Sequence, residues 1–304
     1  MSSLPLVSII SINYNQLHHT CAMIESLRKI SYPNIEIIIV DNASKESPRE
    51  KLEKDFPEAI LILSEDNLGF AGGNNLGIKR ATGKYLLFLN NDTEVVPGFL
   101  EPLVNLFESN TSVGIASPKI LYYDSGETIQ YVGCERVNPY TGRNKRIGFK
   151  EIDHGQFDTL AETELAHGAA MMLPRTVIDK VGLMPELFFL YYEELDWCES
   201  VKNKGYKIFV VPQSKVYHKE SMSIGKNSTL KTYYITRNRL LFMRRNTSGI
   251  TKLSWIIFYI IFSIPKNSLK YFLSREFDQL KAFWKGSLWN ITHLTNGNKI
   301  KFPA

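Results

Sequence analysis

The sequence predicts an α/β fold, in which a mostly parallel, doubly wound central sheet is flanked by helices and followed by a helical C-terminal extension. Three observations support this prediction. Short apolar runs alternate with segments of helical spacing over the first 90 residues, the runs end in polar residues, and helix-type patterns dominate after residue 225.

The predicted elements alternate in the order that a parallel sheet requires. The apolar runs are short and rich in Val and Ile, whereas the segments between them repeat apolar residues every three or four positions. Residues 137–158 form an irregular polar excursion that we expect to fold over the site. The expected strands are residues 6–12, 35–40, 60–63, 84–89, 167–173 and 206–211. The expected helices are residues 17–30, 48–56, 69–80 and 193–204, and residues 179–189 are expected to form a helix and a turn.

Polar residues cluster at the ends of the predicted strands, in residues 13–15, 41–44, 67–75 and 90–92. Open α/β sheets bind ligands beyond the carboxyl ends of their strands, so these clusters should meet at one edge of the sheet. This edge is the expected ligand site.

The composition is that of a globular chain with a full core: 304 residues, 44% hydrophobic and 22% charged, with a net charge of +5. Residues 1–200 contain 17 Lys and Arg against 28 Asp and Glu, whereas residues 201–304 contain 19 against 3. The two parts should therefore face different partners.

The sequence favours a reducing, cytoplasmic setting. Cys21, Cys134 and Cys198 are widely separated and form no CxxC pair, which argues against a disulfide framework and a structural zinc site. The N-terminus lacks the pattern of a signal peptide. The longest apolar stretch, residues 253–264, is shorter than the roughly 18–20 residues of a spanning helix, so we expect no segment to cross a bilayer.

Candidate ligands for a nucleotide lie at the expected edge. Asp41, beside Asn13 and Tyr14, could accept hydrogen bonds from a base or ribose, and capping of the next helix is an equally weighted alternative. The Gly72-Gly73 pair near a helix start allows close approach of a sugar or phosphate, although a tight helix–sheet contact explains it as well.

Asn90-Asn91-Asp92 follows a strand, where the Asp92 carboxylate could hold a hard divalent cation that also binds two phosphate oxygens. His218, just after the last predicted strand, could complete the metal shell. Taken alone, the tripeptide is typical of a polar turn and the histidine of a structural residue. Their position at the ligand edge favours the metal interpretation.

Three carboxylates, Glu193, Glu194 and Asp196, follow the aromatic run at residues 188–192. Adjacent acids beside apolar rings generally have raised, coupled pKa values, which suits a general base near neutral pH. The alternative is a helix start in which acidic side chains offset the macrodipole. Both can hold, with Asp196 serving the helix and Glu194 facing the site.

Together these segments resemble the family-2 glycosyltransferases, and within them the rhamnosyltransferases, over residues 6–220. Eight collinear matches carry the resemblance: residues 7–15, 40–44, 67–75, 89–92, 155–158, 167–171, 192–196 and 216–218.

The resemblance implies a GT-A fold, a Mg²⁺ or Mn²⁺ cofactor, and inverting transfer of one sugar from a nucleotide-diphosphate donor to an acceptor hydroxyl. It implies Asp92 and His218 as metal ligands and Glu194 as catalytic base, with Glu193 and Asp196 beside it. The expected donor is dTDP-L-rhamnose, and the expected acceptor is a cell-surface polysaccharide or a lipid-linked saccharide. The implied donor-binding residues are Asn13, Tyr14, Asn15, Asp41, Asn67, Gly72, Gly73, Asn74, Asn90, Asn91, His167 and Gly168.

Three positions depart from the family pattern. Asn90 replaces the first aspartate of the usual metal motif, which lowers the expected metal affinity. Glu194 replaces an aspartate as base and reaches one methylene further, and Ser200 stands where relatives often have Arg. The Gln-x-x-Arg-Trp signature of processive synthases is absent, which favours addition of a single sugar.

The chain divides into a catalytic domain at residues 1–224 and a basic, aromatic helical region at residues 225–304. Such a region suits the surface of an anionic membrane, where a lipid-linked acceptor would lie. We therefore expect a cytoplasmic protein that is peripheral on the inner face of the cell membrane. A homodimer contact or ordinary core are alternatives, and nucleic acid is not an expected partner.

Other functions fit parts of the pattern. The donor could carry galactose, glucose or N-acetylglucosamine, and the fold could also belong to a nucleotidyltransferase or a non-catalytic sugar-nucleotide-binding protein. A nucleotidyltransferase should have a Gly-rich basic loop after its first strand, and Asn13-Tyr14-Asn15-Gln16 is not one.

Overall fold

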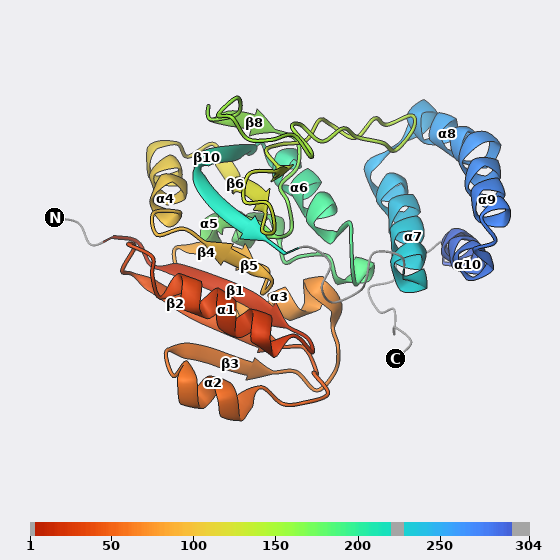
Figure 1. Cartoon of the computed structure of the whole chain (residues 1–304). Helices are drawn as coiled ribbons and strands as arrows, with labels where there is room; N and C mark the ends of the chain where they lie inside the picture. The colour runs from red at the N-terminus through yellow and green to blue at the C-terminus, as the bar shows by residue number, and fades with distance from the viewer. Residues whose placement is uncertain (1–3, 220–227, 294–304) are drawn as a thin grey trace.

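The computed structural model describes residues 4–219 and 228–293 (Figure 1). One mixed sheet has the strand order β3-β2-β1-β4-β9-β6-β10-β5, with β7 beside β6 and β8 beside β10. This arrangement confirms the predicted α/β class. The strands are β1 Val7–Asn13, β2 Ile35–Asp41, β3 Ala59–Leu63, β4 Tyr85–Leu89, β5 Thr93–Val95, β6 Val113–Tyr122, β7 Ile129–Tyr131, β8 Ala161–Thr163, β9 Ala170–Pro174 and β10 Lys207–His218.

The helices flank the sheet and form the C-terminal region. They are α1 Leu17–Leu27, α2 Arg49–Asp55, α3 Gly69–Arg80, α4 Leu100–Ser109, α5 Arg175–Val181, η1 Glu186–Phe188, α6 Glu193–Asn203, α7 Thr229–Asn246, α8 Gly249–Phe258, η2 Tyr259–Ser263, α9 Ile264–Leu273 and α10 Phe277–Thr292.

The first half of the sheet is parallel, as predicted: β1 pairs with β2 and β4, and β2 pairs with β3. The register sets Asn13 opposite Asp41, so the carboxyl ends of β1 and β2 are level. The second half differs, because β9 runs antiparallel to both β4 and β6. This arrangement brings the start of β9 to the ligand edge, beside the end of β4.

The helix and turn predicted at residues 179–189 are confirmed only in part, because the helix begins and ends earlier than expected. Residues Arg175–Val181 form the short helix α5, which ends at Gly182 with a φ of 87°, and only Glu186–Phe188 resume a helical turn. Glycine adopts this left-handed conformation without a steric penalty, and Pro185 interrupts the backbone hydrogen bonding that a continuous helix would need.

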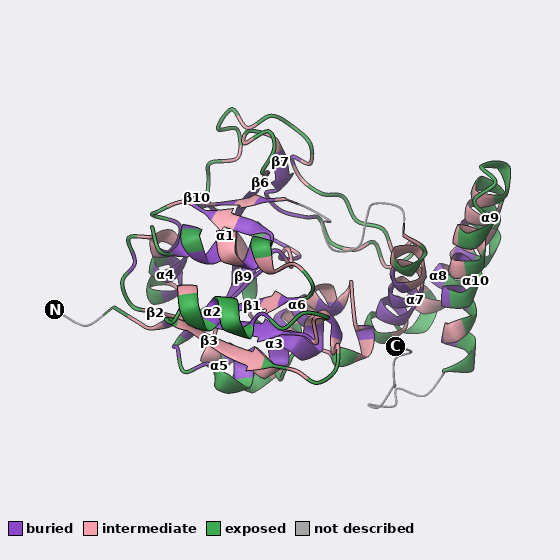
Figure 2. Cartoon of the chain, turned by 60° about the horizontal axis from the view of Figure 1, so that its bottom comes forward, coloured by how far each residue is buried: buried purple, intermediate pink, exposed green. Residues whose placement is uncertain are grey.

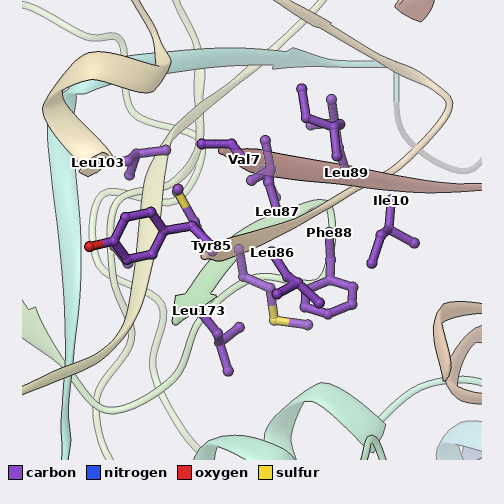
Figure 3. Close-up of a cluster of buried hydrophobic side chains, with 14 of the residues drawn as sticks. Val7, Ile10, Tyr85, Leu86, Leu87, Phe88, Leu89, Leu103 and Leu173 are labelled. Atoms are coloured by element: carbon purple, nitrogen blue, oxygen red, sulfur yellow. The ribbon is translucent and has the colours of Figure 1, made fainter. Parts of the chain in front are cut away.

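The core surrounds β4, whose five residues are all buried (Figure 3). Continuous apolar runs are expected where helices cover both faces of a strand. Leu86, Leu87 and Phe88 are fully buried, and the Phe88 ring meets the Trp197 ring of α6 edge to face at 5.4 Å. This contact ties the start of α6 to the centre of the sheet.

The three helical segments Gly249–Phe258, Tyr259–Ser263 and Ile264–Leu273 form one helix of 25 residues. By length and apolar composition it could cross a membrane, with a mean hydropathy of 1.2 in its most apolar window. It is the one such helix within residues 4–219 and 228–293. The sequence-based expectation that no segment is long enough to cross a bilayer was therefore too restrictive. It counted only the apolar stretch at residues 253–264, whereas the helix extends beyond that stretch through Ser and Lys residues.

The predicted domain boundary between residues 224 and 225 lies outside the described residues. The α7 helix follows this boundary, and it packs both against α6, which precedes the boundary, and against α10 of the C-terminal region (Figure 1). The three cysteines are free thiols, as expected.

A buried cation attaches the polar excursion to the sheet. Lys119 of β6 is fully buried, and its ammonium lies 2.8 Å from Asp153 Oδ1 and 2.6 Å from Asp158 Oδ1. The excursion is also joined to the C-terminal helices, because the Arg239 guanidinium donates to the Thr141 carbonyl at 2.9 Å. Residues 137–158 are thereby held at both ends.

We expect Lys119→Met to lower the free energy of unfolding by about 3 kcal/mol, because it leaves the carboxylate of Asp153 buried without its cation. Urea denaturation would measure this loss. Lys215→Met is the matched control, since Lys215 is 39% exposed and lies 3.9 Å from the same carboxylate. Equal losses in the two variants would contradict a special role for the buried ion pair.

Candidate active site

A cavity of about 550 Å³ opens at the carboxyl edge of the sheet. Ten of the predicted site residues line it: Tyr14, Asn67, Asn90, Asn91, Asp92, His167, Gly168, Glu193, Glu194 and His218. The predicted metal ligands and two of the three predicted catalytic carboxyls therefore share one cavity. The other seven predicted residues do not line it: Asn13, Asn15, Asp41, Gly72, Gly73, Asn74 and Asp196.

Antiparallel pairing of β5 with β10 brings Asp92 and His218 together. The register sets His218 opposite Thr93, next to Asp92 in the chain. The His218 Nε2 atom lies 3.1 Å from Asp92 Oδ1, and both side chains are largely buried. Burial, the largest single influence, raises the pKa of Asp92, but the His218 imidazole, a backbone hydrogen bond and His19 together lower it below its usual value.

These two side chains fit a divalent cation. The Oδ1 atom of Asp92 is buried and makes no aligned hydrogen bond, although His218 is within ion-pair distance. Two neighbouring ligands of an octahedral ion, with bonds of about 2.1 Å, are about 3 Å apart. The His218 Nδ1 atom lies 2.7 Å from Gln130 Oε1, so it carries the proton and leaves the Nε2 lone pair free.

The two ligands do not form a complete metal cage. Among the described residues, no group of three or more His, Cys, Asp or Glu side chains is arranged to hold a metal ion. A cation held by Asp92 and His218 would therefore keep several positions for water or for oxygens of a ligand, as Mg²⁺ sites in nucleotide enzymes commonly do.

The carboxyl groups of Glu193 and Glu194, at the start of α6, also line the cavity; Glu193 is buried and Glu194 is half-buried. The Oε2 atoms of Glu193 and Glu194 are buried without a hydrogen-bond partner. Burial raises the pKa of Glu194 to about 7. Burial and the charge of Glu194 raise the pKa of Glu193 well above its usual range. Unpartnered, perturbed carboxyls in a cavity are typical of functional sites.

Asp41 is satisfied by its own neighbours. Its Oδ1 atom accepts hydrogen bonds from Asn13 Nδ2 at 2.7 Å and Ser44 Oγ at 2.6 Å, and Oδ2 accepts from Ser44 N at 3.1 Å. Asn15 organises the same turn, because its Oδ1 accepts from Lys45 N at 2.8 Å. These contacts order the turn after β2, and Asp41 does not cap the next helix, α2, which has no side-chain cap at Pro48. A contact between Asp41 and a nucleotide base stays a prediction.

The Gly72-Gly73 pair serves packing. A Cβ atom on Gly73 would lie 2.9 Å from the Ile12 side chain, and one on Gly72 would lie 2.6 Å from the Leu68 Cβ. Asn74 donates to the Phe70 carbonyl inside the helix. The tight helix–sheet contact therefore explains Gly73, whereas Gly72 and Asn74 have close neighbours within α3 and its N-cap, and none of the three lines the cavity.

Asp196 points away from the cavity and joins α6 to α7. Its carboxylate lies 3.0 Å from both Arg245 Nε and Arg245 Nη2, and it accepts from Asn246 Nδ2 at 2.8 Å. A paired, buried carboxylate is poorly suited to act as a base, so these contacts favour a structural role for Asp196 over the predicted catalytic one.

The segment before Glu193 has an unusual backbone. Phe189, Tyr191 and Tyr192 have φ values of 66°, 68° and 78°, a left-handed conformation that non-glycine residues rarely adopt. Gly69 permits this path, since a Cβ there would lie 2.1 Å from the Phe189 carbonyl oxygen.

Two consecutive residues of α7 hold this segment in place. The Asn238 amide nitrogen lies 2.9, 2.7 and 2.8 Å from the carbonyl oxygens of residues 188, 190 and 191. Arg237 Nη2 donates to the carbonyls of residues 187 and 188, and its Nε donates to Asn238 Oδ1 at 2.7 Å. Both side chains are buried. We call residues 187–192 the aromatic loop and these two side chains its clamp.

Several cavity residues were not predicted. Arg146 belongs to the polar excursion at residues 137–158, which was expected to cover the site, but no sequence motif identifies this particular residue. Gln130 and Lys231 also line the cavity. His167 was predicted, and burial lowers the pKa of its imidazole to about 3, so the ring is neutral. Only the fold could identify the first three.

The sheet and its ligand edge define the class of protein. The described structure superposes on the mannosyltransferase PcManGT from Pyrobaculum calidifontis, solved with GDP-Man and Mn²⁺, with a TM-score of 0.56 and 13% identity over 97% of this chain and 77% of that one. It also matches GalNAc-T7, solved with UDP, GalNAc and Mn²⁺, with a TM-score of 0.61 and 16% identity over 96% and 55% of the two chains. The fold is GT-A, as expected.

The sequence relationship is more specific. The model of glycosyl transferase family 2 matches residues 8–181, and the chain therefore belongs to this family. Two similar relatives are the low-salt glycan biosynthesis hexosyltransferase Agl10 of Haloferax volcanii and the dTDP-rhamnosyl transferase RfbF of Shigella flexneri. The first is 27% identical over 77% of this chain and 74% of its own, and the second 26% identical over 77% and 79%.

Removal of the clamp should release the aromatic loop. We expect Asn238→Ala to lower the free energy of unfolding by about 2–3 kcal/mol, since it strands buried carbonyl groups. Hydrogen exchange of peptides covering residues 187–192 should accelerate at least tenfold, with β1 to β4 unchanged. Asn267→Ala is the control, because Asn267 donates only within its own helix, to Ser263. Unchanged exchange in the aromatic loop would contradict the clamp.

Proposed function

We propose that this family 2 glycosyltransferase is a metal-dependent, inverting hexosyltransferase that moves a single sugar onto an acceptor hydroxyl. One observation carries the proposal: the Asp92–His218 pair and the buried carboxyls of Glu193 and Glu194 line the same cavity. An inverting transfer needs charge neutralisation on the departing diphosphate and a base for the acceptor, and the two pairs supply candidates for each.

Asp92 and His218 would hold the divalent cation, Mg²⁺ or Mn²⁺, through Oδ1 and Nε2. When bound, the cation supplies Lewis-acid stabilisation of the diphosphate leaving group. Arg146 and Lys231 line the same cavity and add positive charge from this chain toward the phosphates. The Mn²⁺ in the similar structures of PcManGT and GalNAc-T7 supports a metal of this kind.

Glu194 would act as the general base that takes the proton from the acceptor hydroxyl. With a pKa near 7, the carboxyl is half ionised at neutral pH and accepts a proton more readily than an ordinary glutamate. Burial and the charge of Glu194 raise the pKa of Glu193 well above its usual range, so the two neighbouring carboxyls disfavour ionising together.

For the donor we propose dTDP-L-rhamnose, and for the acceptor a saccharide of a cell-surface polysaccharide, free or lipid-linked. The similarity to RfbF supports the donor, and Agl10 supports hexosyl transfer more generally. Screening nucleotide sugars with Mn²⁺ by thermal shift tests this choice. The correct donor should raise the melting temperature most, and a larger shift with a UDP- or GDP-hexose would contradict rhamnosyl transfer.

Replacement of the base should separate binding from turnover. We expect Glu194→Gln to lower kcat by about 10²–10⁴-fold, while the melting-temperature shift with donor is kept. Turnover is measured as nucleoside diphosphate released in the presence of acceptor. Glu199→Gln is the control on the same helix, since Glu199 pairs with Lys202 and does not line the cavity.

The pH dependence follows from the same residue. Because the base must be ionised, wild-type turnover should rise with pH up to about 7 and fall roughly tenfold per unit below it. Turnover that is flat between pH 5.5 and 8 would argue against Glu194 as the base.

Metal binding can be tested without catalysis. With dTDP as ligand, we expect Mn²⁺ to raise the melting temperature above the value in EDTA, and Asp92→Ala or His218→Ala to abolish that increment. Asp124→Ala, on a turn that does not line the cavity, should keep it. An increment that persists in both site variants would place the cation elsewhere.

A further inference from the structure

The C-terminal helices expose an unusual amount of apolar surface. Of the large apolar side chains that are at least half exposed in the described part of the chain, eleven lie on α8 to α10 and two, Leu4 and Ile152, lie elsewhere. Ile250 is 79% exposed, Leu273 71% and Ile291 65%. Figure 2 shows the outer sides of α9 and α10 as exposed, at the end of the molecule away from the sheet.

These side chains form one face of well-packed helices. Residues 250, 253, 257 and 261 are exposed at helical spacing, while Trp255 and Tyr259 of the opposite side are buried. The Tyr259 hydroxyl lies 2.7 Å from Ser287 Oγ of α10. The inner face therefore has its partners, and the outer face has none within the described residues. Contiguous apolar surface of this kind is typical of an interaction site.

The same helices also carry a basic fringe. Residues 249–293 contain six Lys and Arg against two Asp and Glu. No carboxylate among the described residues lies within ion-pair distance of Lys266, Lys270 or Lys285, and the acid Asp278 pairs with Lys281. A surface that combines apolar side chains with free ammonium groups is complementary to a layer of anionic headgroups over hydrocarbon.

A second cavity, of about 500 Å³, lies between α7 and the pair α9 and α10. Its charged lining consists of Lys231, Arg239 and Lys270 against the one acid Glu276. The Nε atom of Arg239 is buried there without a hydrogen-bond partner. This lining suits a phosphate group, which is the charged part of an anionic lipid.

We propose that the outer face of α8 to α10 binds the surface of an anionic lipid bilayer, with its apolar side chains below the headgroups and its lysines beside the lipid phosphates. A second copy of the chain would fit this face less well, because it would bring two basic fringes together. The proposal agrees with the expected position at the inner face of the cell membrane.

The helices lie on the bilayer and do not cross it. At 16 residues, or about 24 Å, α10 is shorter than the roughly 30 Å hydrocarbon core, yet it exposes Leu288 and Ile291 in the same manner. Extraction of α8 and α9 into a spanning position would also expose Trp255 and Tyr259, which are buried against α7 and α10.

The geometry also links the lipid surface to the transfer site. Ser228 and Lys231 line both the second cavity and the donor cavity. A phosphate-bearing acceptor in the second cavity would therefore lie next to the donor. This step, unlike the lipid binding itself, rests on the proposed function.

Sedimentation with lipid vesicles tests the proposal on the full chain. We expect binding to vesicles of phosphatidylcholine with about 30% phosphatidylglycerol, little binding to phosphatidylcholine alone, and weaker binding at high salt. The variant L253S/I257S/I261S should lower the vesicle affinity at least tenfold. These side chains are 58%, 47% and 57% exposed, so the fold should survive, and an unchanged urea midpoint would verify this.

A matched control changes three exposed leucines elsewhere, L63S/L160S/L183S, at 39%, 44% and 42% exposure, and should bind vesicles like the wild type. Equal binding of both triple variants, or no binding of the wild type, would overturn the proposal. Resistance of bound protein to an alkaline carbonate wash would overturn it in favour of a spanning helix. If the wild type formed a dimer and did not bind vesicles, and if L253S/I257S/I261S but not the control variant were monomeric, the face would be assigned to self-association.

Discussion

The pairing of β5 with β10 is the interaction on which the site depends. It joins the segment that follows β4 to the end of the last strand, and sets Thr93 opposite His218. The Asp92 carboxylate and the His218 imidazole thereby meet, and Gln130 orients the ring through its other nitrogen. In the proposed function, a cation held by only these two side chains would need further oxygens from the diphosphate, which would couple cation binding to donor binding.

The α7 helix belongs to the catalytic unit. Asn238 and Arg237 fill the hydrogen-bonding needs of the carbonyls in the aromatic loop, and Arg245 with Asn246 holds the other side of α6 through Asp196. A left-handed backbone at three non-glycine residues persists only where its surroundings over-determine it. A division of the chain before α7 would therefore separate the carboxyls of α6 from the residues that position them.

Burial of Glu193 and Glu194 opposes folding at neutral pH. Because folding raises the pKa of both carboxyls, ionising Glu194 weakens the folded state as the pH rises from about 4.5 toward 7. Close packing of apolar side chains around the pair offsets this cost. One such contact joins the Phe88 ring to the Trp197 ring, one turn further along α6. Such a local loss of stability is expected where a fold maintains a reactive carboxyl.

The sequence by itself determined the α/β class, the parallel pairing of β1 to β4, and ten of the residues that line the cavity, because apolar periodicity and polar strand ends are local properties. It also showed the basic, aromatic character of the C-terminal region. The tertiary structure decided between alternatives that local patterns leave open: Gly73 packs against β1, Asp196 pairs with Arg245, and Arg146 lines the cavity. It also decided which face of α8 to α10 is left exposed. Contacts between segments distant in the chain depend on strand register and helix packing, which no single stretch of residues encodes.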